Sequence, residues 1–70
     1  MSDAVQLTIN GVDRQVDDVR TVADLLAQLG LADRHVAVEV NLDVVPKAQH
    51  GAYRLAAGDR IEIVTLVGGG

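Results

Sequence analysis

Residues 21–30 read TVADLLAQLG, and this stretch decides the fold because it marks both ends of a helix. Thr21 can act as the N-cap, and Asp24 completes a capping-box pattern at the positive end of the helix dipole. Gly30 suits the left-handed position that follows many helices. Between these ends lies one apolar stripe at i, i+3, i+4 and i+7, made of Val22, Leu25, Leu26 and Leu29. The stretch predicts a short amphipathic helix with a single buried face.

Alternating apolar and polar residues precede this helix, a pattern typical of strands with one buried face. The alternation predicts a strand over residues 5–9 and a return strand over residues 12–17. Asn10 and Gly11 between them are a strong hairpin signal, because both residues accept a positive φ. These residues therefore predict a β-hairpin ahead of the helix.

Residues 36–40 alternate in the same way after the helix and predict another strand. Residues 41–43 are typical of a turn, and residues 44–45 of a short strand that a proline ends, which suits a sheet edge. Residues 47–57 are irregular and predict a loop with one turn of helix. The last strand is expected over residues 60–66.

This order of elements predicts an α+β fold in which one helix covers one face of a mixed sheet of four to five strands. The ubiquitin-like β-grasp satisfies it, with the first and last strands side by side in the middle of the sheet. Parallel neighbours need a crossover, which the segment containing the helix can supply. We predict a β-grasp domain over residues 1–66 and a flexible glycine tail over residues 67–70.

The chain has 70 residues, no cysteine and a net charge of −4, with acidic and basic residues spread along it. It lacks the basic stripe of a nucleic-acid binder, and anionic membranes are disfavoured for the same reason. No apolar run approaches the ~20 residues that span a bilayer, and the start of the chain does not resemble a secretory signal. His35 and His50 lack ligand spacing and are expected on the surface. We expect a cytoplasmic protein without a metal site.

The sequence ends with Gly68, Gly69 and Gly70, which suits a carboxylate that an enzyme must reach. Without Cβ atoms the segment can lie extended in a narrow channel of a partner's active site. A carboxylate needs ATP for activation, and the chain has no phosphate-binding loop, so a partner must supply that site. Since no cysteine can hold sulfur, the carbon of Gly70 could hold it as a thiocarboxylate. The alternative is a frayed end or cloning remnant.

The alternation of the last strand directs Ile61 and Ile63 toward the helix and the residues between them to the opposite side. Exposed apolar residues beside a functional tail can mark a partner surface. The alternative is that scattered surface aliphatics are normal. We predict a partner-docking face made of Ala37, Glu62, Val64, Leu66 and Val67.

The chain resembles the ThiS family of sulfur carriers of thiamine biosynthesis over nearly its whole length. The resemblance lies in residues 10–11 (NG), 21–26 (TVADLL), 36–41 (VAVEVN), 45–47 (VPK), 58–64 (GDRIEIV) and 68–70 (GGG). It departs from the family at His50, where many members have tryptophan, and in the turn after Asn41.

This resemblance implies a carrier that is not an enzyme, binds no cofactor and is a monomer when free. An E1-like adenylyltransferase of the ThiF type would use ATP to adenylate Gly70. A sulfur donor such as a cysteine desulfurase would then allow thiocarboxylate formation, and a thiazole synthase of the ThiG type would accept the sulfur. Two rivals remain open: a molybdopterin-synthase small subunit with the same terminal chemistry, and a β-grasp interaction module indifferent to losing its last glycines.

Overall fold

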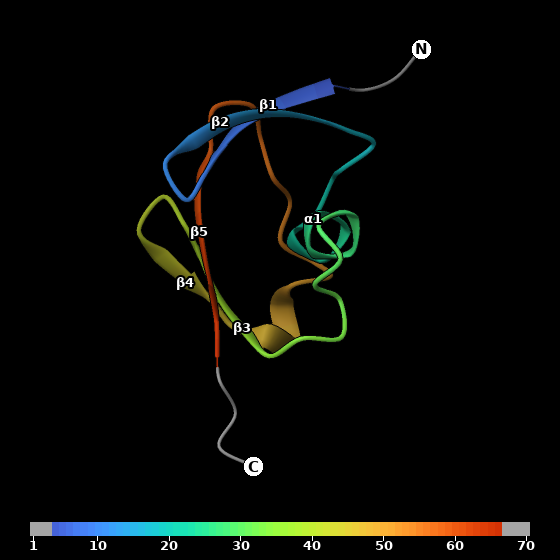
Figure 1. Cartoon of the computed structure of the whole chain (residues 1–70), viewed down its shortest axis with the longest axis vertical. Helices are drawn as coiled ribbons and strands as arrows, with labels where there is room; N and C mark the ends of the chain where they lie inside the picture. Colours follow the sequence, from blue (N-terminus) through green and yellow to red (C-terminus); the bar gives the residue numbers. More distant parts are fainter. Residues whose placement is uncertain (1–3, 67–70) are drawn as a thin grey trace.

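The computed structural model describes residues 4–66, which form a five-stranded sheet with one helix against one face (Figure 1). The elements in chain order are β1 (Ala4–Ile9), β2 (Val12–Asp17), α1 (Val22–Gln28), β3 (Val36–Val40), β4 (Asp43–Val45), a 3-10 helix η1 (Lys47–Gln49) and β5 (Arg60–Thr65). The strand order is β2-β1-β5-β3-β4. β1 and β5 are parallel and the other pairs antiparallel. The predicted mixed sheet, its single helix and its central pair are confirmed.

Two tight turns set the registers of the outer strand pairs. Asn10 and Gly11 have φ values of 49° and 81°, as the hairpin prediction requires. Asn41 and Leu42 also have positive φ values, 52° and 74°, and they connect β3 to β4. Because this second turn uses only two residues, Asp43 pairs with Val40. The prediction of a turn over residues 41–43 is therefore wrong at its last residue, which belongs to the strand.

Helix α1 has the ends that the sequence predicts. The Oγ1 of Thr21 accepts the N–H of Asp24 at 3.2 Å, and the Asp24 carboxylate accepts the N–H of Thr21 at 3.1 Å. After the helix, Gly30 has a φ of 76°, and the N–H of Leu31 donates to the carbonyl of Leu26 at 2.7 Å. This is the Schellman arrangement, which turns the chain sharply back toward the sheet.

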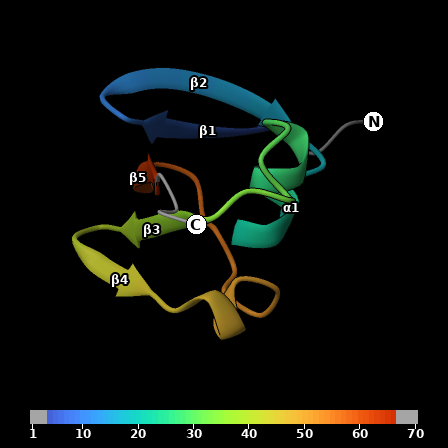
Figure 2. The ribbon, with the colours of Figure 1, turned by 60° about the horizontal axis from the view of Figure 1, so that its bottom comes forward.

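The core lies between α1 and one face of the sheet, an arrangement seen from below in Figure 2. All of its buried members are aliphatic, so β-branched and leucine side chains fill the layer without aromatic help. They are Leu7, Ile9, Val16, Val19, Val22, Leu25, Leu26, Val38, Val40, Val45, Ile61 and Ile63. Tyr53 and Leu55, from the irregular segment after η1, pack against this cluster. That placement agrees with the loop and helical turn predicted there.

One prediction about the irregular segment is wrong: His50 is not on the surface and is only 8% exposed. Its ring Nε2 lies 3.1 Å from the carbonyl oxygen of Val45, and its own carbonyl accepts the N–H of Ala23 at 2.9 Å. The residue therefore joins the end of β4 to the first turn of α1. His35 is exposed, as predicted. No helix within residues 4–66 is both long enough and apolar enough to cross a bilayer.

Candidate functional site

The candidate site begins where the central strand β5 ends. β5 pairs with β1 on one side and with β3 on the other, so its path is fixed by two neighbours. Beyond the strand, the N–H of Leu66 still donates to the carbonyl of His35 at 2.8 Å. The predicted tail residues Gly68, Gly69 and Gly70, and the predicted docking residue Val67, lie outside the described residues.

The outer face of the sheet, away from α1, carries the predicted docking residues that belong to β3 and β5, whereas Leu66 follows β5 and lies near Leu26 of α1. Ile61 and Ile63 are buried toward the helix, and Glu62 between them is exposed. Val64 and Leu66 are 56% and 54% exposed, and Ala37 pairs with Val64 across the β3–β5 ladder. The predicted division of the strand into two sides is confirmed. A docking role for this side stays a prediction.

The outer face also holds residues that the sequence-based set missed. Glu39 of β3 pairs directly with Glu62 of the neighbouring strand β5. Glu39 also pairs with Val44 of β4, the neighbouring strand in the other direction, and Val44 is 71% exposed. Like charges directly opposite each other on a sheet destabilise the pair. The alternation of residues 36–40 places Glu39 on the same side of the strand as Ala37, so this alternation could have identified Glu39 as a residue of the outer face. We define the outer face as Ala37, Glu39, Val44, Glu62 and Val64.

A hollow of about 200 Å³ lies on this face where β3 and β5 meet the second turn. Glu39, Glu62 and Arg60 line it together with the turn residues Asn41 and Leu42. The side-chain amide of Asn41 fixes this corner, accepting the N–H of Arg60 at 3.0 Å and donating to Asp59 at 3.0 Å. The acidic pair thus stands on rigid backbone rather than on a loop.

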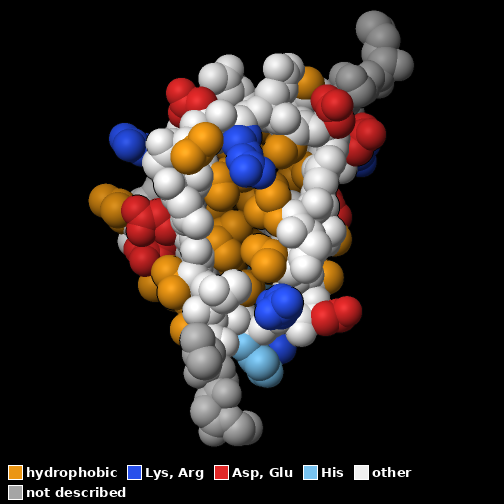
Figure 3. Space-filling model, viewed as in Figure 1, with side chains coloured by type: hydrophobic (Ala, Val, Ile, Leu, Met, Phe, Trp, Pro, Cys, Tyr) orange, Lys and Arg blue, Asp and Glu red, His pale blue; other side chains and the backbone are white. Residues whose placement is uncertain are grey.

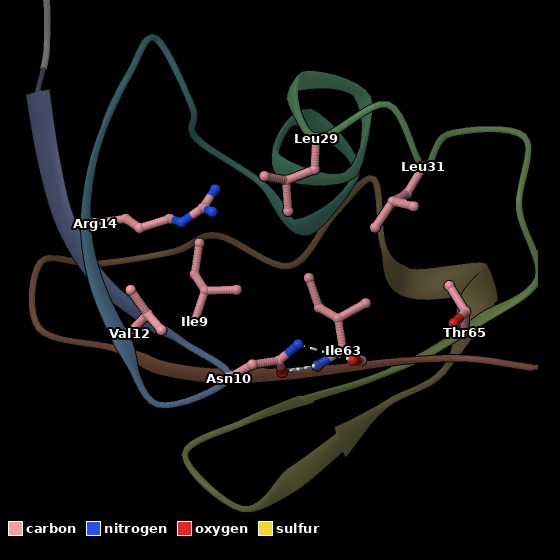
Figure 4. A pocket seen from close by; sticks show the side chains of 8 residues that line it. All are labelled: Ile9, Asn10, Val12, Arg14, Leu29, Leu31, Ile63 and Thr65. Carbon is pink, nitrogen blue, oxygen red and sulfur yellow. Dashed lines mark hydrogen bonds between the residues drawn. The ribbon is translucent and has the colours of Figure 1, made fainter.

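On the helix side, a hollow of about 460 Å³ opens between the β1–β2 turn, the end of α1 and β5 (Figure 4). Figure 3 shows hydrophobic side chains on its floor with a basic side chain across it, and Figure 4 shows Arg14 reaching toward α1 there. The Asn10 side chain is bound to the backbone of Ile63: its amide oxygen accepts the N–H of Ile63 at 2.8 Å, and its amide nitrogen donates to the carbonyl of Ile63 at 3.1 Å. Among the described residues that line the hollow, Arg14 is the one titratable residue, so they provide no acid–base pair there.

Metal chemistry finds no support in the described part of the chain. Residues 4–66 contain no group of three or more histidine, cysteine, aspartate or glutamate side chains that could hold an ion. The Nε2 of His50 is engaged with a backbone carbonyl. What the described residues form is a rigid frame around the end of β5.

Comparison with known proteins assigns this frame to a family. The model of the ThiS family matches residues 7–70. The chain belongs to the ThiS family. The crystal structure of the thiamine biosynthesis protein ThiS from Geobacter metallireducens superimposes with a TM-score of 0.79 at 33% identity, covering 94% of this chain and all of that one. The resemblance drawn from the sequence is thereby confirmed.

Two kinds of relative are similar to this ThiS-family chain. The sulfur carrier protein ThiS of Bacillus subtilis is 40% identical over 65 residues, covering 91% of this chain and 98% of the relative. Thiazole synthases of Paramagnetospirillum magneticum and Magnetococcus marinus are 44% and 38% identical over 66 residues. This chain spans only 20% of the length of those two synthases. They therefore combine a ThiS-like segment with a much longer remainder.

Proposed function

We propose that this ThiS-family chain is a sulfur carrier of thiamine biosynthesis, which enzymes modify and which is not itself an enzyme. The observation that carries the proposal is the central strand β5, which runs to an exposed Leu66 at the edge of the fold and is followed by Val67 and three glycines. Family membership and the likeness to the Bacillus subtilis carrier support the pathway. The likeness to thiazole synthases favours it over molybdopterin synthesis.

The chemistry proposed for Gly70 is acyl activation followed by sulfur transfer. A carboxylate oxygen attacks the α-phosphorus of ATP, pyrophosphate leaves, and an acyl-adenylate forms. The terminal persulfide sulfur of the donor attacks the carbonyl carbon, and the bond to AMP breaks with its electron pair leaving on AMP. A thiol supplied by a partner then attacks the donor's sulfur in the resulting acyl disulfide, forms a disulfide with it, and releases the sulfur on Gly70. The product is a thiocarboxylate. Partners would supply the acid–base groups for both steps.

The partners in this proposal are an E1-like adenylyltransferase of the ThiF type, a sulfur donor such as a cysteine desulfurase, and a thiazole synthase of the ThiG type. Two relatives named thiazole synthase contain a segment similar to this chain, which favours a thiazole synthase as a partner. The outer face is the proposed docking surface for the adenylating enzyme. A cation on that enzyme would relieve the repulsion between Glu39 and Glu62.

Intact mass measurement tests the function. The protein is incubated with ATP, the adenylating enzyme and a sulfur donor, and we expect a gain equal to one oxygen-for-sulfur exchange, located on Gly70. A variant lacking Gly70 is the matched control and should show no gain while its unfolding temperature stays unchanged. An unchanged mass under conditions that modify an authentic carrier would contradict the proposal. Equal modification of the shortened variant would do the same.

A further inference from the structure

A third hollow adjoins the end of β5 on the side away from the outer face's acidic pair. Its volume is about 220 Å³, and four of its lining residues carry basic side chains. We call it the cationic hollow; it is lined by Leu26, Ala32, Arg34, His35, Val36, Lys47, His50 and Leu66. Two of the six Lys and Arg residues of the chain and both of its histidines meet here, in a protein of net charge −4.

The backbone around the cationic hollow is fixed by three hydrogen bonds. The N–H of Arg34 donates to Leu31 at 3.0 Å, directly after the Schellman turn of α1. The carbonyl of His35 accepts the N–H of Leu66, and the N–H of His50 donates to the carbonyl of Lys47 at 3.1 Å. The basic residues therefore stand in set positions around the point where the chain leaves β5.

His50 forms part of the lining with one ring nitrogen still available. A carbonyl oxygen only accepts, so Nε2 must carry the proton in its contact with Val45. Nδ1 makes no hydrogen bond with the described residues. Every side-chain nitrogen or oxygen that is fully buried among these residues does have a hydrogen-bond partner, so Nδ1 is not fully buried. Nδ1 must therefore reach solvent, although the ring as a whole is nearly buried.

The charged groups of Arg34 and Lys47 have no side-chain partner among the described residues. Among residues 4–66, neither the guanidinium of Arg34 nor the ammonium of Lys47 forms an ion pair or a side-chain hydrogen bond. Figure 3 shows basic and histidine side chains close to where the described chain ends. Unpaired cations at one place on an acidic protein form a local positive potential that can attract an anionic surface.

We propose that the cationic hollow docks acidic side chains at the rim of the thiazole synthase site that receives the tail. This inference rests on the proposed function. Leu66 lines the hollow, and four residues extend at most roughly 14 Å. A partner that takes Gly70 into its active site must therefore bring its surface within reach of Arg34 and Lys47. The charges are exposed, so their main effect is on the rate of association and on its salt dependence.

Charge reversal with a matched control tests the inference. The variant Arg34→Glu, Lys47→Glu is compared with Arg14→Glu, Arg54→Glu, which makes the same change in net charge at exposed residues of β2 and of the loop before β5. Association with a ThiG-type thiazole synthase is followed by stopped-flow fluorescence at low and at high salt. We expect the first variant to associate roughly tenfold more slowly at low salt, and the difference to shrink at 1 M salt.

Two readouts separate this inference from the proposed function. The charge-reversed variant should still gain sulfur on Gly70 when the adenylating enzyme and donor are present, because its tail and its outer face, the proposed docking surface for that enzyme, are unchanged. Equal slowing of both variants, or slowing that persists at high salt, would overturn the docking inference and leave the carrier function standing. Saturable binding of inorganic phosphate in the hollow at micromolar concentration would also overturn it, since the hollow would then be a small-anion site. Failure of the unaltered protein to gain sulfur would instead contradict the function.

Discussion

The outer face lies on β3, β4 and β5 and the cationic hollow lies at Leu66, just beyond β5, but the two are built in different ways and carry opposite charge. The outer face is a product of strand pairing, which sets Glu39 opposite Glu62. The cationic hollow is a product of loops, held together by Leu31, His35 and His50. A carrier must meet several partners with one tail, and two unlike surfaces beside that tail allow it to discriminate between them.

Ile61→Ala should damage both surfaces and give the largest effect on stability. Ile61 is 1% exposed, and its strand supports the outer face and leads to the hollow. Removing a buried isoleucine side chain costs about 2–5 kcal/mol, as lost transfer energy and as a cavity. Urea unfolding measures the change, with Val64→Ala on the exposed side of the same strand as the control. A loss as large for Val64→Ala would show that the two sides are not distinct.

His50→Ala should affect the cationic hollow and spare the outer face. The substitution removes the hydrogen bond between the ring Nε2 and the Val45 carbonyl at a buried place, a loss of about 0.5–1.5 kcal/mol. Amide hydrogen exchange should rise in β4, η1 and the first turn of α1, while the β3–β5 ladder keeps its protection relative to global unfolding. His50→Gln tests whether a side-chain donor can recover part of the loss. Uniform loss of protection would contradict a local role.

The failure to predict His50 shows where sequence reasoning stopped. Successive side chains of a strand point to opposite faces, so alternation alone assigned Ile61 and Ile63 to the helix side and Glu62 and Val64 to the outer side. Helix caps are also local signals, because they involve residues only a few positions apart. His50 stands in an irregular segment without a period. Its carbonyl accepts the N–H of Ala23, a residue far away in the chain. No local pattern records such a contact.

The like-charge pair on the outer face was missed for a related reason. Its two members lie on the expected side of the sheet, but only the register of β3 against β5 sets Glu39 opposite Glu62 rather than beside it. A shift of the register by two residues would keep the same faces and remove the pair. Local alternation therefore predicts sides, and the tertiary structure decides partners.

Glu62→Gln should stabilise the free protein slightly while weakening its docking. Removing one carboxylate of a directly opposed pair should raise the free energy of unfolding by about 0.2–1 kcal/mol, and salt should reduce this gain because it screens the repulsion. Glu39→Gln is the matched control and should give a similar gain, whereas the double variant should add little more. Thermal unfolding at low and high salt measures this. Destabilisation by Glu62→Gln would mean that the carboxylate has a favourable partner that outweighs the repulsion.

Asp24→Asn should give the smallest effect, and one that leaves both surfaces intact. The N–H groups of Arg20 and Thr21 hold the pKa of the Asp24 carboxyl below its ordinary value. A folded-state pKa below the unfolded one contributes stability above the unfolded pKa, and this contribution is lost as the pH falls below about 4. The wild type should therefore lose its small advantage over Asp24→Asn on acidification, as unfolding temperatures between pH 7 and pH 3 would show. Because α1 begins on the far side of the core from the outer face, sulfur transfer and docking should not change. A docking defect in this variant would mean that the helix start, and not only the end of β5, takes part in partner binding.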